Sequence, residues 1–324
     1  MLKKLTAMVS ALMLAICCAT AAAQTDSYPN GPIKIVVPYP PGATIDTMAR
    51  LLAEKWTQTL GKAVIVENKS GAGGVIAMQS VARAAPDGLV LIAFNTDLVG
   101  SMPAMHHPAP YDPIKDFAPI GTIVRGNPFV LAVNPALPIR NFADFVALAK
   151  SPRGEINFGT YGIGSLPHLG FAYLQTELGL NMVHVPYKGG AQSYLAAMSG
   201  EVQVVAGTSF VDLIKSGKLR GIAIGGHKRS PNYPDIPTFA ELGINMPVMG
   251  ETYVGLAAPG GTPKAVIDRL NNELKAFSTM PDVIERVGKF YSTAHIGPEE
   301  LATMMRRDVT VYGPIVRKLG LTAK

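Results

Sequence analysis

Two copies of one pattern, in which apolar strands alternate with glycine turns and helices, dominate the sequence. The first copy has strands at 33–37, 63–66 and 89–94, glycine turns at 42 and 70–74, and helices from about 46 to 60 and up to about 84. The second has strands at 156–158, 182–185 and 202–206, glycine turns at 159–165 and 188–190, and helices from about 167 to 178 and up to 198. Strands that alternate with helices join through right-handed crossovers into mostly parallel sheets. The sequence therefore predicts an α/β protein of two similar lobes, each a mixed or parallel sheet flanked by helices.

Two segments without long helices, 116–134 and 252–263, separate the second copy from the rest of the chain. We interpret them as two crossings between the lobes. We expect the last helices, at about 263–278, 282–291 and 298–319, to pack back on the first lobe. This gives a discontinuous domain 1, residues 24–124 plus 249–324, and an inserted domain 2, residues 125–248. Two sequential domains with a C-terminal helical cap remain the alternative.

The N-terminus has the order of charge and hydropathy that is typical of a secretory signal peptide. Lys3 and Lys4 come first, an apolar run follows, and small alanines lead up to Ala23. Residues 1–23 are therefore the predicted signal peptide, with cleavage near Ala23, and we expect a soluble, exported protein. No apolar run in the chain reaches the ~18 residues that a membrane-spanning helix needs. Cys17 and Cys18 are the only cysteines, so the mature chain would have no disulfide and no cysteine metal site.

Cleavage would leave 301 of the 324 residues and would lower the formal net charge from +6 to +4, because both N-terminal lysines are lost. A chain of this length suits two domains better than one small core. The remaining positive charge is scattered, without a run of five basic residues, and this disfavours a nucleic-acid surface. A mildly basic exported protein is compatible with small anionic ligands.

The glycine turns lie where ligands bind in such sheets, beyond the carboxyl ends of the strands. A helix that begins there has up to four unpaired N–H groups and about half a positive charge at its N-terminus, which favours anions. In the first lobe Gly42, Ala43 and Thr44 supply small residues and a hydroxyl, and Asp46 is placed to cap the helix or to order the loop. The matching turn of the second lobe contains Thr160, Gly162, Gly164 and Ser165. Two such turns on facing lobes predict an anion that is held from both sides.

Catalytic and metal motifs are incomplete. Ser165 lacks the glycine two residues later that a nucleophile elbow uses, and Ile76 stands where a dinucleotide loop has its third glycine. His106 and His107 are adjacent and have no patterned further ligand, which indicates a surface loop rather than a metal site. For His168, one turn into a helix at the predicted site, a structural role and a hydrogen bond to a ligand both remain open. We expect no enzymatic activity, no cofactor and no bound metal.

Eight blocks of sequence match a known family in the same order. They are residues 38–46, "ENKSGAGG" (67–74), "AAPDG" (84–88), "YDPIKDFAPI" (111–120), "HVPYKGG" (184–190), "SGKLRGIAI" (216–224), "RSPNYPDIPTFAE" (229–241) and "LAAPGGTP" (256–263). Over essentially the whole mature chain, the sequence resembles the periplasmic substrate-binding proteins of tripartite tricarboxylate transport systems, the Bug receptors. The resemblance implies a two-lobed periplasmic binding protein of the type II kind, with a ligand cleft between the lobes.

The function that the resemblance implies is capture of a small carboxylate in the periplasm by hinge closure, with delivery to the permease subunits of a membrane transporter. We expect the receptor to be a monomer. The family's ligand contacts, carried over to matching positions, fall in the first lobe on Tyr39, Gly42, Ala43, Thr44, Asp46, Phe94 and Asn95. In the second lobe they fall on Thr160, Tyr161, Gly162, Gly164, Ser165 and His168.

The sequence departs from the family pattern at two turns. Ala43 replaces a second glycine, which narrows the conformations open to the first turn. The turn at 206–209 lacks the acidic residue of many relatives, and this favours a dicarboxylate or an aromatic carboxylate over an amino acid, with Thr208 or Ser209 as neutral donors. Two alternatives remain: a sensory receptor of the same fold that signals to a membrane partner, and an exported hydrolase that uses Ser165 and His168.

Overall fold

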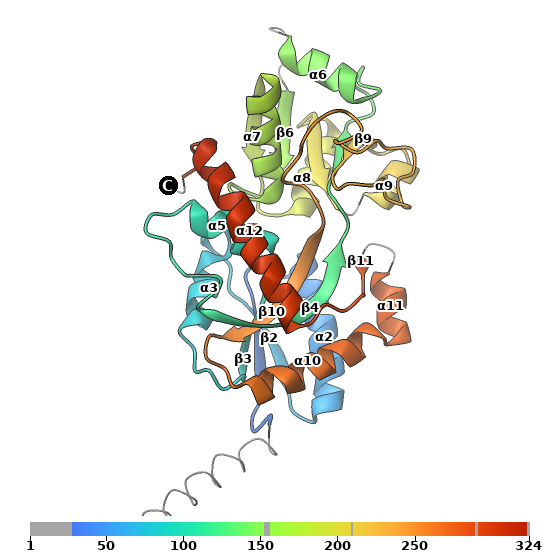
Figure 1. Cartoon of the computed structure of the whole chain (residues 1–324). Coiled ribbons are helices and arrows are strands. Elements are labelled where there is room, and N and C mark those ends of the chain that lie inside the picture. The colour runs from blue at the N-terminus through green and yellow to red at the C-terminus, as the bar shows by residue number, and fades with distance from the viewer. Residues whose placement is uncertain (1–27, 152–155, 209, 289–290, 323–324) are drawn as a thin grey trace, which may run out of the picture.

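The chain folds into two lobes, each built on one β-sheet (Figure 1). The computed structural model describes residues 28–151, 156–208, 210–288 and 291–322. The predicted signal peptide, residues 1–23, lies outside the described residues. None of the helices in the described ranges combines the length and the apolar character needed to cross a membrane.

The first lobe contains a six-stranded sheet with the order β11-β4-β10-β3-β1-β2. Its strands are β1 (Ile33–Val37), β2 (Val64–Asn68), β3 (Val90–Asn95), β4 (Phe117–Gly126), β10 (Thr252–Pro259) and β11 (Tyr291–Ser292). The core on one face includes residues of α2 (Thr44–Leu60), α10 (Lys264–Ser278) and α11 (Pro281–Val287). The core on the other face includes residues of α3 (Val75–Ala82), which follows the short helix η1 (Ala72–Gly74), and of α4 (Thr96–Val99) and α5 (Ser101–Ala104).

The second lobe contains a five-stranded sheet with the order β7-β6-β8-β5-β9. Its strands are β5 (Val130–Val133), β6 (Ile156–Thr160), β7 (Met182–Pro186), β8 (Val204–Gly207) and β9 (Arg220–Ile224). One core includes residues of α6 (Phe142–Lys150) and α7 (Leu166–Leu178), and the other includes residues of α8 (Gly190–Ser199) and α9 (Val211–Lys215).

The two sheets share one plan. The order β2-β1-β3-β10-β4 in the first lobe corresponds to β7-β6-β8-β5-β9 in the second, and in both sheets the fourth of these strands is antiparallel to its neighbours. The first three strands of each set are parallel to one another. The predicted fold of two similar mixed sheets flanked by helices is thus confirmed.

Both ends of the chain contribute to the first lobe. Strand β10, from the C-terminal part, pairs with β3 and β4, whereas the strands of the second lobe all come from residues 130–224. This is the layout of a discontinuous domain with an insertion. The domain limits at 124/125 and 248/249 remain predictions.

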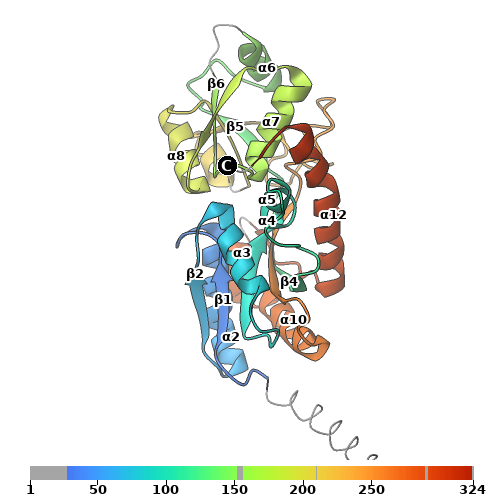
Figure 2. The same cartoon turned by 90° about the vertical axis from the view of Figure 1, so that its left-hand side faces the viewer.

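The last helix, α12 (Pro298–Lys318), runs along both lobes (Figures 1 and 2). Its Leu301 and Met305 belong to a core of the first lobe, whereas Tyr312 and Ile315 belong to a core of the second. The sequence led us to expect packing on the first lobe alone. The periodicity of a helix shows which face is buried but not what covers it, and this accounts for the difference.

Candidate ligand-binding site

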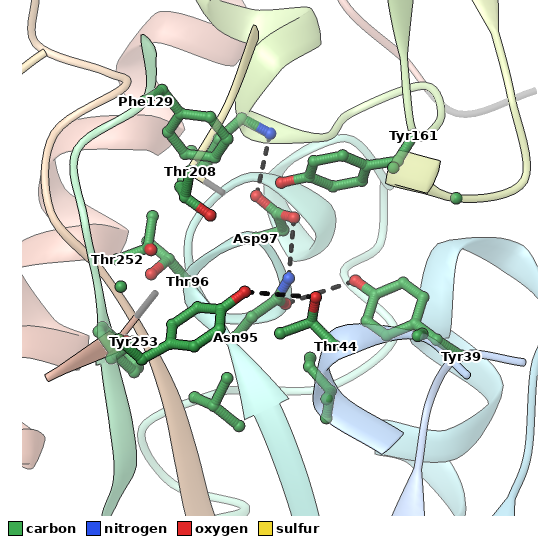
Figure 3. A pocket seen from close by; sticks show the side chains of 18 of the residues that line it. Tyr39, Thr44, Asn95, Thr96, Asp97, Phe129, Tyr161, Thr208, Thr252 and Tyr253 are labelled. Atoms are coloured by element: carbon green, nitrogen blue, oxygen red, sulfur yellow. Dashed lines mark hydrogen bonds between the residues drawn. The ribbon is translucent and has the colours of Figure 1, made fainter. Parts of the chain in front are cut away.

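A cavity of about 150 Å³ lies between the lobes. Of the residues predicted to contact a ligand, six line it: Tyr39, Ala43, Thr44, Asn95, Tyr161 and Thr208. Figure 3 shows five of these side chains converging from opposite sides. The beginning of α2 forms one wall, and the beginning of α8 belongs to another. The wall also includes Gly126 and Thr252, at the ends of the strands from which the chain passes between the lobes.

The turn before α2 is built to present backbone N–H groups. Gly42 has φ +84°, a conformation that favours glycine, and Ala43 is the N-cap residue but has no side chain to cap with. The carboxylate of Asp46, 2% exposed, turns back and accepts a hydrogen bond from the Gly42 N–H at 2.8 Å. The helix itself begins at Thr44, two residues earlier than predicted. Thr44 and Ile45 line the cavity, so the first turn of α2 opens into it.

Asp46 also accepts hydrogen bonds from Arg50 Nε at 3.0 Å and from Asn68 Nδ2 at 2.8 Å. Burial by itself would raise the pKa of Asp46, but the hydrogen bonds from Arg50, Gly42 and Asn68 outweigh burial and hold the pKa below its usual value. The carboxylate is therefore ionised at neutral pH and fully engaged within its own lobe. Asp46 orders the turn and does not line the cavity, which agrees with the loop-ordering role considered from the sequence.

The turn before α7 repeats this backbone geometry. Gly164 has φ +81°, and the N-cap residue Ser165 has φ −64° and ψ 155°, against −64° and 156° for Ala43. The Gly164 N–H donates to His168 Nδ1 at 3.0 Å, so His168 takes the place that Asp46 has in the first lobe. Each turn also has a tyrosine three residues before its glycine, Tyr39 and Tyr161.

One ring nitrogen of His168 is thus engaged in holding this turn. Its Nδ1 accepts a hydrogen bond, so the ring is neutral with its proton on Nε2. It stacks on the ring of His184 with centroids 4.0 Å apart, and His184 Nε2 lies 2.7 Å from the hydroxyl of Thr160. Burial lowers the pKa of His168 to about 4. His168 and Thr160 do not line the cavity.

Other predicted residues lie beside the cavity or behind it. Phe94 is buried and packs edge-on against Tyr253, with centroids 6.0 Å apart. Gly42 and Gly164 shape their turns without lining the cavity, while Gly162 and Ser165 line a neighbouring groove of about 720 Å³. Ser209, considered beside Thr208 as a donor, lies outside the described residues. The residues that line both spaces, and so mark where cavity and groove meet, are Tyr39, Tyr161, Asp97 and Lys188.

Sequence reasoning missed Asp97, a carboxylate of the first lobe that is 1% exposed. It accepts a hydrogen bond from Asn95 Nδ2 at 3.0 Å and, across the lobe boundary, from the backbone N–H of Leu166 at 2.9 Å. The hydroxyl of Tyr161 is a third donor. Burial raises the pKa of Asp97 to about 6, despite these hydrogen bonds. Leu166 is the first residue of α7, so the N-terminus of α7 already holds a carboxylate.

The second missed feature is the turn at Lys188, Gly189 and Gly190, which lines the cavity at the N-terminus of α8. Lys188 is the one lysine or arginine among the lining residues that the structure describes. The rule that ligands sit beyond the carboxyl ends of strands applies to this turn as well, because it follows β7. Applied to every glycine turn, that rule would have included it.

A third missed residue, Thr96, lines the cavity directly after β3, as Thr208 does after β8. The Thr96 hydroxyl is buried and has no hydrogen-bond partner within the described chain. Buried hydroxyls are nearly always hydrogen-bonded, so this unpaired hydroxyl is an exception beside the cavity. Aromatic side chains complete the wall, among them Phe129, Tyr194 and Tyr253.

The chain has the fold of a periplasmic binding protein. Its two α/β lobes share one strand order, and a cavity lies between them at the helix N-termini. A model of the tripartite tricarboxylate transporter family receptor matches residues 48–321. The chain belongs to this family of solute-binding receptors, as the resemblance of its sequence blocks implied. The family is one of receptors rather than of enzymes.

Individual relatives agree with this assignment. A UPF0065 protein of Bordetella pertussis is 34% identical over 321 residues, which is 95% of either chain. The structure of the periplasmic binding protein BugD has 32% sequence identity and a TM-score of 0.80, and the match covers 92% of this chain and 100% of that one. R. palustris Rpa4515, solved with adipate, has 26% identity and a TM-score of 0.81, and the match covers 91% of this chain and 99% of the other.

Proposed function

We propose that this protein is a periplasmic receptor that captures a small carboxylate, either a dicarboxylate or an aromatic carboxylate, by closure of its lobes. The observation that carries the proposal is the equivalence of two turns. The N-terminus of α7 holds the carboxylate of Asp97. The N-terminus of α2 has the same backbone angles and opens into the cavity, but no side chain of the described residues caps it. A ligand carboxylate at α2 would use the chemistry that the protein itself uses at α7.

The rest of the cavity suits such a ligand. Lys188 and the N-terminus of α8 supply positive potential from the opposite lobe, and the Thr96 hydroxyl supplies a hydrogen bond. The aromatic wall suits an apolar body between the polar ends. Binding from two lobes favours the closed state, because the ligand then contacts both. The adipate in the related Rpa4515 structure supports this class of ligand.

Delivery of the ligand to a membrane permease completes the proposal, and it rests on membership of the transporter family. The signal peptide at 1–23, with cleavage near Ala23, and the monomeric state belong to the same proposal. The hydrolase alternative is weakened by the geometry. The Ser165 hydroxyl donates to the Gly162 carbonyl at 2.7 Å, and His168 Nδ1 accepts from Gly164, so the pair does not form a nucleophile and its base.

A thermal-shift screen of the mature protein tests the ligand class. Aliphatic dicarboxylates, tricarboxylates and aromatic carboxylates are compared with uncharged amides of the same carbon skeletons. A ligand that binds only the folded state stabilises it by RT ln(1 + [L]/Kd), so one class of carboxylate raises the melting temperature and its amide does not. A flat response to every carboxylate would contradict the proposal.

A further inference from the structure

Asp97 connects the two lobes through a hydrogen bond. It lies in α4, directly after the third strand of the first lobe, while its acceptor oxygen Oδ1 meets the N–H of Leu166 in the second lobe. A second bond beside it also crosses the boundary, since the Ser101 hydroxyl donates to the Gly164 carbonyl at 2.7 Å. The carboxylate is thus held at the junction of the lobes and at the rim of the cavity.

Helix α7 has no cap of its own. The hydroxyl of Ser165, its N-cap residue, is turned away to the Gly162 carbonyl. Helix α2 likewise has no side-chain cap, because Ala43 has no polar atom. The two helices therefore begin with the same backbone geometry and the same unmet need for an acceptor. In α7 a residue of the other lobe meets that need, and in α2 no side-chain cap within the described chain does so.

We propose that Asp97 is a specificity-determining residue that takes the place of a ligand carboxylate at α7 and so restricts the charge that the cavity accepts. This inference rests on the proposed function, since it concerns the selection of carboxylates. With α7 filled, the helix N-termini that line the cavity without a side-chain cap, among the residues that the structure describes, are those of α2 and α8. A ligand must then present an uncharged group toward α7, because a carboxylate placed there would lie against Asp97 in a site of low polarity.

A different role for Asp97, as the partner of a ligand ammonium, fits its contacts less well. An ionised carboxylate offers about four acceptor positions, and Leu166, Asn95 and Tyr161 already donate to it. One acceptor position remains by this count, but the side chain is 1% exposed, so an ammonium could not reach that position without moving one of these donors. The two experiments that follow separate the two roles.

The first experiment is chemical rescue and needs no substrate. Asp97→Ala removes the carboxylate and leaves a space of its size at the N-terminus of α7, so formate should bind in that space. At about 100 mM, formate should raise the melting temperature of Asp97→Ala by roughly 3 °C more than that of the wild type. Acetate should rescue less than formate, and pivalate, which is too large for the space, should not rescue.

Asp308→Ala is the matched control. Asp308 is also a buried carboxylate with a tyrosine donor, Tyr253 at 2.7 Å, but within the described chain it accepts no hydrogen bond from a helix N-terminus. Formate should therefore not rescue Asp308→Ala. A folded Asp97→Ala protein that gains no more from formate than Asp308→Ala would overturn the proposal, whether or not the protein binds a carboxylate substrate.

The second experiment uses Asp97→Asn, which keeps the volume and an acceptor for Leu166, and it decides the matter if Asp97→Ala does not fold. The affinities of wild type and variant are compared for pairs that differ by one carboxylate, hexanoate with adipate and benzoate with terephthalate. Loss of the fixed negative charge should shift the ratio of dissociation constants roughly tenfold toward the dianion. An unchanged ratio would overturn the assignment. So would an amine-bearing ligand that binds the wild type but not Asp97→Asn.

Discussion

The turn before α2 and the turn before α7 have the same backbone but different partners. Gly42 and Gly164 differ by 3° in φ, since they have +84° and +81°, and in each turn the glycine N–H donates to the side chain four residues later. That side chain is the carboxylate of Asp46 in one lobe and the imidazole of His168 in the other. The two lobes therefore present the N–H groups of a helix start in the same way, while the acceptors that bind these N–H groups differ between the lobes.

The two turns also differ in what surrounds them. The α2 turn faces the cavity, and a Cβ added at Gly42 would meet no atom of the described residues within 4 Å. The α7 turn is covered by α5 and the segment after it, and a Cβ at Gly164 would collide with the sulfur of Met105. One turn therefore has room for a ligand, and the other is built into the contact between the lobes.

The largest expected effect is the loss of stability in Gly164→Val. A β-branched residue at this positive φ costs roughly 1–3 kcal/mol by itself, and the collision with Met105 adds the cost of overpacking, about 1–3 kcal/mol. The sum of about 4 kcal/mol should appear as a lower free energy of unfolding in urea titrations followed by circular dichroism. A variant with near wild-type stability would show that the two turns are not fixed to the same degree.

Gly42→Val tests the open turn in the same way. The backbone strain is equal, but no atom stands in the way of the new side chain, so the loss of stability should be smaller than in Gly164→Val. Binding should suffer instead, by roughly a hundredfold, because relief of the strain at residue 42 moves the backbone N–H groups of the first turn. Calorimetric titration with the best carboxylate of the screen measures this. Wild-type affinity in Gly42→Val would remove α2 from the ligand site.

Acid should affect the second lobe through its histidine pair. Burial lowers the pKa of His168 to about 4, and burial together with the charge of His168 lowers the pKa of His184 to about 3. In the unfolded chain both histidines bind a proton with a pKa of about 6.5, whereas in the folded chain they stay neutral until the pH is much lower. The stabilising contribution is therefore complete above pH 6.5 and is lost as the pH falls toward 4. We expect a loss of about 2 kcal/mol between pH 7 and pH 5, a value reduced for the partial exposure of His184.

A double variant, His168→Asn with His184→Gln, provides the reference for this measurement. Asp97 and Asp308 have raised pKa values, about 6 and 7, because they are buried, and their effect on stability has the opposite sign. These carboxylates are present in both proteins, so their contribution cancels in the difference. Parallel curves of unfolding free energy against pH for the two proteins would contradict the prediction.

The sequence predicted the sheets well because their strands and glycine turns are local patterns. The sequence predicted less well those features that depend on contacts between residues far apart in the chain. The hydrogen bond between Asp97 and Leu166 joins positions 69 residues apart. No local sequence pattern around Asp97 predicts it. The same applies to α12, whose buried stripe divides between two lobes. Tyr39 and Thr44, two of the predicted ligand contacts, line the cavity, whereas Gly42 shapes the turn between them.

The smallest expected effect is that of Thr44→Ala. Thr44 is the first residue of α2 and lines the cavity, and its hydroxyl accepts a hydrogen bond from the Tyr291 hydroxyl at 3.4 Å. If the backbone N–H groups of α2 dominate, loss of this hydroxyl should weaken binding by only ~1 kcal/mol, the net worth of one hydrogen bond. Thr47→Ala, on the same helix but away from the cavity, is the control and should bind like the wild type. A loss in Thr44→Ala as large as that in Gly42→Val would mean that the first turn does not hold the anion through its backbone.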